Sequence, residues 1–145
     1  MKQKFILFTI VFLMPAAVLA QGAIGTWDSA STIGLIPRYG HASVVMNDKI
    51  FIFGGHPIDS FTDTLEIFDP LTNSWQIPMA SGVFTPRYDL ASCVWSGKIY
   101  AIGGGKPTEL NTLEIFDPVT NTWSQPTTTG TFTPRLGLTA SVVGD

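Results

Sequence analysis

The chain of 145 residues lacks most of the patterns that carry chemistry. Its only cysteine is Cys93, which excludes an intrachain disulfide, so stability must come from burial of apolar side chains. The two histidines, His41 and His56, lie 15 residues apart with no cysteine nearby, which is not a spacing of metal ligands. Neither G-x-S-x-G nor H-E-x-x-H occurs. The sequence therefore predicts no metal, no cofactor and no catalytic residue, and leans against an enzyme.

Basic residues are also scarce. Eight Lys and Arg face eleven Asp and Glu, and no basic cluster occurs, so nucleic acids and anionic membranes are poor candidate partners. Lys106 follows three glycines, but a phosphate-binding loop would need a wider glycine spacing, a Ser or Thr after the Lys, and a following helix. There is no N-x-S/T sequon, and no amphipathic helix is expected after residue 20.

The first 20 residues have the pattern of a secretory signal peptide. Lys2 and Lys4 are followed by an apolar run over 5–13, and Val18-Leu19-Ala20 places small residues before a cleavage site. The apolar run is shorter than the roughly 20 residues of a membrane-spanning helix, which argues against an uncleaved anchor. We therefore expect cleavage after Ala20. Six basic residues then remain against eleven acidic ones, a net charge of −5, and the mature protein is expected to have no membrane contact.

The most informative pattern is an internal repeat. Residues 64–75 read TLEIFDPLTNSW and residues 112–123 read TLEIFDPVTNTW, with ten of twelve positions identical. The segment KIFIFGG at 49–55 returns as KIYAIGG at 98–104, and TPR recurs at 85–87 and 133–135. A period near 48 residues predicts a repeat architecture of small supersecondary units.

Each repeat predicts four antiparallel strands. Two apolar runs flank a turn at Asn47-Asp48 or Ser96-Gly97, which is the pattern of a β-hairpin. Because these runs do not alternate with polar residues, we expect both faces of each hairpin to be buried. Buried positions are expected at Val45, Ile52, Val94 and Ile102. Pro78 and Pro126 fall in the fourth strand, which should therefore be the exposed edge.

Such sheets must bury their faces against copies of themselves, as the blades of a β-propeller do. The chain resembles a known family, the Kelch repeat. The matching positions are Arg38, Gly54-Gly55, Phe68-Asp69-Pro70 and Trp75, then Arg87, Gly103-Gly104, Phe116-Asp117-Pro118 and Trp123. The usual Tyr before Asp-Pro is Phe in both copies. The resemblance implies a propeller fold and functions that range from protein binding to sugar conversion.

We thus expect an all-β fold of about two and a half four-stranded antiparallel blades of an incomplete Kelch-type ring. The expected divisions are the signal peptide (1–20), an outer strand and loop (21–38), two repeats (39–86 and 87–134) and the start of a third (135–145). Two full units cannot close a ring, which needs at least about four blades. The sequence therefore predicts that further blades or self-association cover the open blade faces, in a longer protein or in an assembly of copies.

The candidate site residues lie where each fourth strand leads into the next repeat. Arg38, Arg87 and Arg135 occupy equivalent positions, where three guanidinium groups around one mouth would bind carboxylates or phosphates. The alternative, which we favour, is that each braces its own loop, with Glu66 or Glu114 as partner. Positions that differ between the repeats are the better binding candidates: Tyr39, His41, His56, Asp59, Tyr88, Asp89 and Lys106.

The favoured function is an exported, secreted or periplasmic, non-catalytic module that recognises a protein or a glycan through its blade loops. One alternative is part of an exported sugar-processing Kelch enzyme, similar to a sialic-acid mutarotase or a copper radical oxidase, with catalytic residues outside this segment. A truncated product without a function of its own is the third possibility.

Overall fold

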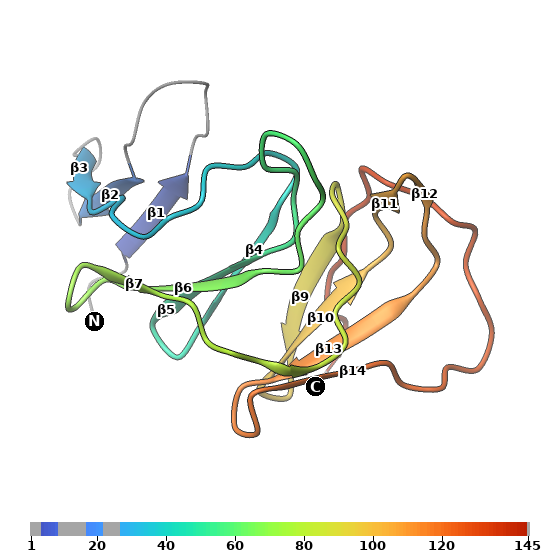
Figure 1. Cartoon of the computed structure of the whole chain (residues 1–145). Helices are drawn as coiled ribbons and strands as arrows, with labels where there is room; N and C mark the ends of the chain where they lie inside the picture. The colour runs from blue at the N-terminus through green and yellow to red at the C-terminus, as the bar shows by residue number, and fades with distance from the viewer. Residues whose placement is uncertain (1–3, 9–16, 22–26, 145) are drawn as a thin grey trace.

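The computed structural model describes residues 4–8, 17–21 and 27–144, with side chains from Ser29 onward (Figure 1). The described part of the chain forms strands and loops, and it contains no helix that is long and apolar enough to cross a membrane. In chain order, the strands are β1 (Lys4–Phe8), β2 (Ala17–Gln21), β3 (Trp27–Ala30), β4 (Ala42–Met46), β5 (Lys49–Phe53), β6 (Leu65–Asp69), β7 (Ser74–Gln76), β8 (Ser81–Gly82), β9 (Ala91–Trp95), β10 (Lys98–Ile102), β11 (Gly105–Lys106), β12 (Thr108–Glu109), β13 (Leu113–Asp117) and β14 (Thr122–Ser124).

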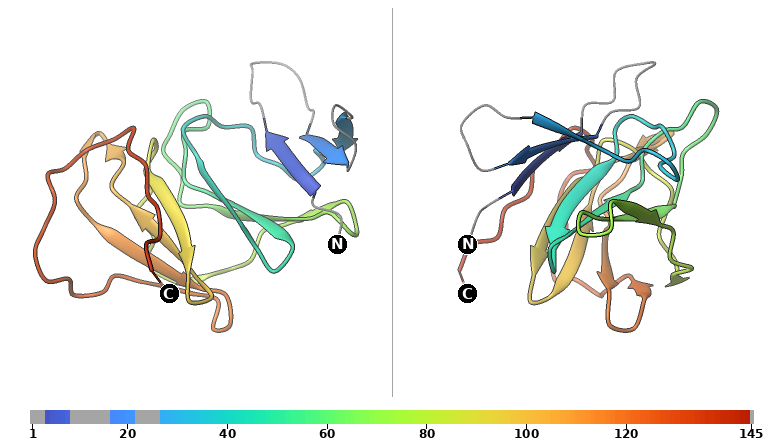
Figure 2. Two further views of the ribbon diagram at one scale, coloured as in Figure 1. Left: turned by 180° about the vertical axis from the view of Figure 1, so that it is seen from behind. Right: turned by 90° about the vertical axis from the view of Figure 1, so that its left-hand side faces the viewer.

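Two antiparallel meanders form the body of the molecule. The first repeat forms a four-stranded sheet in the order β4-β5-β6-β7. The second repeat supplies four strands of a five-stranded sheet in the order β8-β14-β13-β10-β9, and β8 comes from the segment before it. The sheets lie side by side, with β4 packed beside β9, as the further views of Figure 2 also show. This all-strand architecture confirms the predicted fold class.

Tight turns fix the hairpin registers as the sequence predicted. In the first repeat, Asn47 and Asp48 have φ of 52° and 58°, and Met46 pairs with Lys49. In the second, Ser96 and Gly97 have φ of 49° and 71°. Two consecutive residues with positive φ match the right-handed twist of the strands that they join. Both predicted hairpins are confirmed.

The repeated Asp-Pro-x-Thr-Asn segment builds the turn between the third and fourth strands. Oδ1 of Asp69 accepts a hydrogen bond from the backbone N of Leu71 at 2.9 Å, and Asp117 does the same for Val119. The Asp69 carboxylate also pairs with Lys49 at 3.0 Å. These local bonds turn the chain so that the tryptophan of the fourth strand pairs with the phenylalanine of the third.

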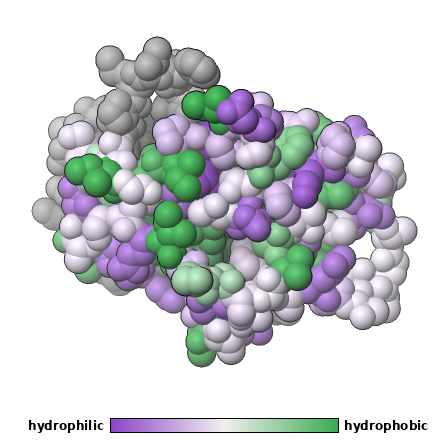
Figure 3. Space-filling model, in the orientation of Figure 1, coloured by the Kyte–Doolittle hydropathy of each residue, from purple (hydrophilic) through white to green (hydrophobic). Residues whose placement is uncertain are grey.

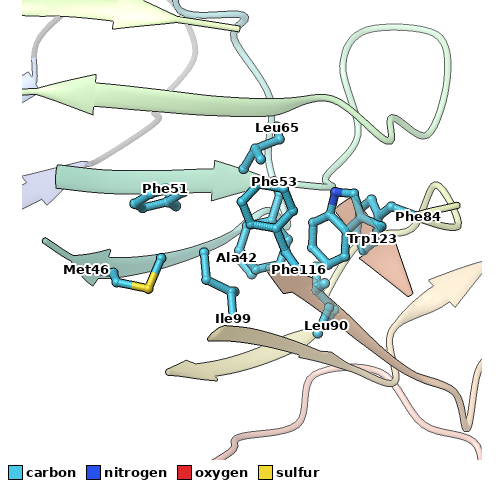
Figure 4. Close-up of a cluster of buried hydrophobic side chains, with 11 residues drawn as sticks. Ala42, Met46, Phe51, Phe53, Leu65, Phe84, Leu90, Ile99, Phe116 and Trp123 are labelled. Atoms are coloured by element: carbon cyan, nitrogen blue, oxygen red, sulfur yellow. The ribbon is translucent and has the colours of Figure 1, made fainter. Parts of the chain in front are cut away.

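A core of large side chains fills the space between the two sheets (Figure 4). Phe53 of the first repeat is fully buried, and its ring centroid lies 5.5 Å from that of Trp123 in the second. Phe84, from the connection between the repeats, stacks on Trp123 at 4.4 Å. Aromatic pairs of this kind add to the stabilisation from burial alone. The core therefore joins the repeats face to face, as the propeller prediction requires.

The prediction that both faces of each hairpin are buried is only partly right. Ile52 is 1% exposed, but Val45 is 67% exposed, and Val94 and Ile102 are half-buried. The first strand of the repeat alternates, because Ala42 and Met46 face the neighbouring sheet while Val45 points to the opposite face. Nothing in the described part of the chain covers that face at Val45.

The predicted edge strands need a similar correction. β7 is the edge of its sheet, as expected, but β14 is not, because the short strand β8 pairs parallel to it. Gly82 allows this approach, since a Cβ there would clash with the carbonyl O of Trp123. Pro78 and Pro126 are half-buried and follow β7 and β14 rather than lying within them.

The predicted signal peptide falls partly on residues 1–3 and 9–16, which lie outside the described residues. Its described parts are β1 and β2, which form an antiparallel sheet with β3. The expected cleavage point lies within β2, where Ala20 pairs with Trp27. β3 occupies the segment where the sequence predicted an outer strand.

Candidate functional site: the loop end of the repeats

One end of the molecule gathers the loops that enter and leave the strands. The segments 36–41 and 85–90 lead into the first strands, and the connections 54–64 and 103–112 join the second and third strands. All of them lie at the top of Figure 1, opposite the hairpin turns. We call this end the loop end.

Double glycines let the repeats meet at the loop end. The backbone N of Gly55 donates to the carbonyl O of Arg87 at 2.7 Å, and Gly104 donates to Arg135 at 2.9 Å. A Cβ on Gly54 would lie 2.8 Å from the same Arg87 oxygen, so this backbone contact excludes any larger residue. The double glycine therefore permits the close approach of the next repeat at the end of the hairpin.

Arg38 is buried and braces the loop end of the first repeat. Its Nη2 donates to Oε2 of Glu66 at 2.6 Å, and its Nη1 donates to the carbonyl oxygens of Gly54 (3.0 Å) and Thr64 (3.1 Å). The second carboxylate oxygen of Glu66 accepts from the backbone N of Ile36 at 2.8 Å. The pair therefore ties the entering loop to the second and third strands.

Arg87 repeats this arrangement in the second repeat. Its Nε donates to the carbonyl O of Thr85 at 3.0 Å, and its Nη1 donates to Gly103 O and Thr112 Oγ1, both at 2.9 Å. Its Nη2 makes an ion-pair contact of 2.6 Å with Oε1 of Glu114. Both side chains are buried. The bracing hypothesis is thus confirmed for Arg38 and Arg87, with Glu66 and Glu114 as their partners.

The electrostatics of these braces follow from burial. Burial lowers the pKa of Arg38 and of Arg87, and the neighbouring carboxylates oppose that change. Burial likewise raises the pKa of Glu66, while Arg38 and the backbone N of Ile36 favour its charged form. Arginine starts from so high a pKa that both guanidinium groups keep their charge. Buried in this way, they are not accessible to an external anion.

Arg135 differs from the other two arginines. It is exposed, and the one hydrogen bond from its side chain in the described structure runs from Nε to the carbonyl O of Thr133 at 3.0 Å. It lines a shallow hollow together with Ile102, Phe132 and Leu138. The structure therefore does not place the three arginines around one shared mouth.

Four rings form an aromatic cluster at the loop end: Tyr39, His56, Phe61 and Tyr88. Tyr39 stacks on His56 with centroids 5.1 Å apart, and Phe61 stacks on Tyr88 at 5.4 Å. His56 meets Phe61 edge to face at 4.9 Å, which joins the two pairs. Three of these residues were predicted site candidates. Phe61, which lies in the mostly polar connection 56–63, was not among the predicted candidates, although an aromatic residue in such a loop is a usable signal.

Asp89 lies beside this cluster at the junction of the two repeats. Its backbone N donates to the carbonyl O of Gly40 at 2.7 Å, and its φ is 51°. A Cβ on Gly40 would lie 2.7 Å from Oδ1 of Asp89 and 3.2 Å from Cβ of Tyr88. The missing side chain of Gly40 therefore leaves room for the Asp89 carboxylate.

The remaining candidates lie apart from the aromatic cluster. Nδ1 of His41 is buried with no hydrogen-bond partner in the described structure, and burial, with a smaller contribution from Arg38, lowers the pKa of this histidine. Asp59 and Lys106 are exposed on the two connecting loops. Within the described residues, no three His, Cys, Asp or Glu side chains lie close enough together to hold a metal ion.

Comparison with known proteins decides the family. The model of the KLHDC2/KLHL20/DRC7 Kelch-repeats domain matches residues 21–145. This chain belongs to the Kelch-repeat family. The four-stranded sheet of the first repeat and the matching strands of the second are thus neighbouring Kelch blades, and their arginine–glutamate braces and double glycines are features of those blades.

Curated Kelch proteins are similar over part of their length. The human (Homo sapiens) Rab9 effector protein with kelch motifs is 35% identical over 85 residues, which cover 55% of this chain and 23% of that protein. Kelch domain-containing protein 3 of mouse (Mus musculus) is 36% identical over 69 residues, which cover 47% of this chain and 18% of that protein. The matched region thus spans less than a quarter of either relative.

Proposed function

We propose that this Kelch chain is an exported protein-binding module and that its loop end carries the contact surface. The observation that carries the proposal is the aromatic cluster of Tyr39, His56, Phe61 and Tyr88 on a braced scaffold. Tyr39 is 57% exposed, whereas the other three are half-buried against one another. Tyrosines with one side packed and one side accessible are the side chains that dominate many protein interfaces.

The braces support this proposal because they hold the loops rigidly before any partner arrives. A loop that is already ordered loses less conformational entropy on binding, which leaves more of the contact energy as affinity. Arg38 and Arg87 each bond to two or more elements of their blade, so the loops that carry Tyr39 and Tyr88 have fixed starting points.

Other surfaces are less suited to this role. Hydrophobic groups on the face drawn in Figure 3 gather over the segment that follows β7, where Ile77, Met79 and Val83 are exposed. These side chains follow one another along a single strand-like segment and are not supported by stacked neighbours. The loop end, in contrast, combines residues from two blades in one place.

Site-specific photocrosslinking tests the contact surface. A benzophenone amino acid at position 39 or 88 should crosslink a protein partner, and the same group at position 71 or 119, on the exposed turns at the opposite end, should not. A crosslinked glycan instead of a protein would change the class of partner. Equal crosslinking from both ends of the molecule would refute a loop-end surface.

Export is the second part of the proposal. It rests on the basic start, the apolar run over 5–13 and the small residues before Gln21. If the leader is processed, the protein recovered outside the cytoplasm begins at Gln21, which intact-mass measurement would detect. A cytoplasmic product that keeps Met1 would contradict export without affecting the binding proposal.

A further inference from the structure

The three repeats share a backbone position that suits glycine, and one of them carries a carboxylate there instead. Gly40, Asp89 and Gly137 are equivalent, and all three have left-handed φ, at 62°, 51° and 66°. Backbone hydrogen bonds link them in series, from Asp89 N to Gly40 O at 2.7 Å and from Gly137 N to Asp89 O at 2.8 Å. Glycine adopts this conformation freely, and aspartate tolerates it with some cost. The fold therefore does not require the side chain of Asp89.

The carboxylate of Asp89 also lacks a structural partner. It is half-buried over Gly40, yet no hydrogen bond or ion pair to it occurs within the described residues. The buried carboxylates of Glu66 and Glu114, in contrast, are fully engaged with arginine and backbone donors. Asp89 thus places a carboxylate without a partner in the described structure at the junction of the blades.

The surroundings of Asp89 favour a positive charge. Tyr39 and Tyr88 immediately precede Gly40 and Asp89 in the sequence, and a Cβ built on Gly40 would touch both Oδ1 of Asp89 and Cβ of Tyr88, which places the carboxylate next to the residues that carry these rings. The exposed acidic side chains on these loops, Asp59, Asp63 and Glu109, outnumber the exposed cations Lys106 and Arg135. Aromatic faces attract cations, and a carboxylate pairs with guanidinium or ammonium groups.

We infer that Asp89, with the rings of Tyr39 and Tyr88, forms a site for a cationic side chain, arginine or lysine, of a protein partner. This inference rests on the proposed function, since it names the chemistry that the loop end would recognise. The carboxylate would pair with the incoming cation, while the tyrosine rings would pack against its aliphatic and planar parts.

Short peptides of defined charge provide the test. Four capped pentapeptides, Gly-Ser-X-Ser-Gly with X as Arg, Lys, Gln or Glu, would be titrated into the full chain while the ring resonances of Tyr39 and Tyr88 are followed by NMR. The Arg and Lys peptides should bind at least tenfold more tightly than the Gln and Glu peptides. Equal binding of all four peptides, or no perturbation of these rings, would overturn the inference.

The repeats themselves supply the matched variant. Asp89→Gly restores the residue that the other two copies carry, so the backbone is retained, and Asp89→Asn keeps the side-chain shape. Both variants should lose most of the preference for cationic peptides, whereas Asp63→Asn, a control for general charge, should keep it. Preference that survives Asp89→Gly would contradict the assignment even if crosslinking at position 88 succeeds, so this outcome separates the inference from the proposed function.

Discussion

The buried pair of Arg87 and Glu114 should be among the most sensitive points of the fold. The Arg87 side chain is fully buried and contacts Thr85 O, Gly103 O, Thr112 Oγ1 and the carboxylate. Arg87→Met keeps much of the aliphatic stem but leaves the Glu114 carboxylate buried without its counter-charge. Removing one partner of a buried ion pair costs about 3–5 kcal/mol.

Two features of the site act on this loss in opposite directions. Thr85 still donates to Glu114 from its backbone N at 3.0 Å and from Oγ1 at 2.7 Å, so the carboxylate keeps two hydrogen bonds. The freed carbonyl of Gly103 adds a penalty of about 1–3 kcal/mol if it finds no other donor. Since the two effects offset each other, we expect Arg87→Met to lower the free energy of unfolding by about 3–5 kcal/mol.

The assay is urea unfolding of the full 145-residue chain, followed by tryptophan fluorescence. The double variant Arg87→Met with Glu114→Leu should be more stable than Arg87→Met alone, because no unpaired charge then remains. Lys98→Ala, which breaks the exposed pair with Asp117, serves as a control and should change little. A loss below about 1 kcal/mol for Arg87→Met, or strictly additive effects of the two substitutions, would refute the bracing role.

Three further predictions concern backbone geometry, pH and the open face. Gly55→Ala should destabilise the protein more than Gly97→Ala. Both glycines have positive φ, but only at Gly55 would a Cβ lie within 3 Å of a backbone oxygen. Equal losses of unfolding free energy for the two variants in urea would contradict this. Burial lowers the pKa of His41 in the folded protein below its unfolded value of about 6.5. The free energy of unfolding should therefore fall as the pH drops below about 6.5, because the unfolded chain then binds a proton more readily than the folded one. His41→Leu should reduce this pH dependence in thermal melts recorded from pH 8 to 5. The segment 21–145 alone should associate on size-exclusion chromatography because Val45 and Trp95 leave apolar surface exposed on the edge strands β4 and β9; a monomer with a sharp cooperative melt would show otherwise.

The parts of the fold that follow from local chemistry could be predicted from the sequence. The Asn47-Asp48 and Ser96-Gly97 turns depend on a few neighbouring residues, and both form at the positions that the sequence predicts. The Arg87 brace was also predictable, because an arginine that recurs in every repeat usually serves the repeat.

The parts that depend on packing between distant segments were harder to predict. The exposure of Val45 depends on which segments cover the sheet. The pairing of β8 with β14 depends on a close backbone approach at Gly82, which no local sequence pattern predicts. The conformation of Asp89 was within reach, since aligning it with Gly40 and Gly137 shows a carboxylate at a glycine position. Its place beside the aromatic cluster required the structure.

The central claim is that the loop end, held by buried braces, is the surface that binds a protein. The most direct measurement is the affinity of the crosslinked partner, once purified, for the unmodified chain and for two variants. Tyr88→Ala at the loop end should weaken binding at least tenfold while Leu71→Ala, on the opposite turn, leaves it unchanged. Unchanged affinity for Tyr88→Ala, or an equal loss for Leu71→Ala, would contradict the claim.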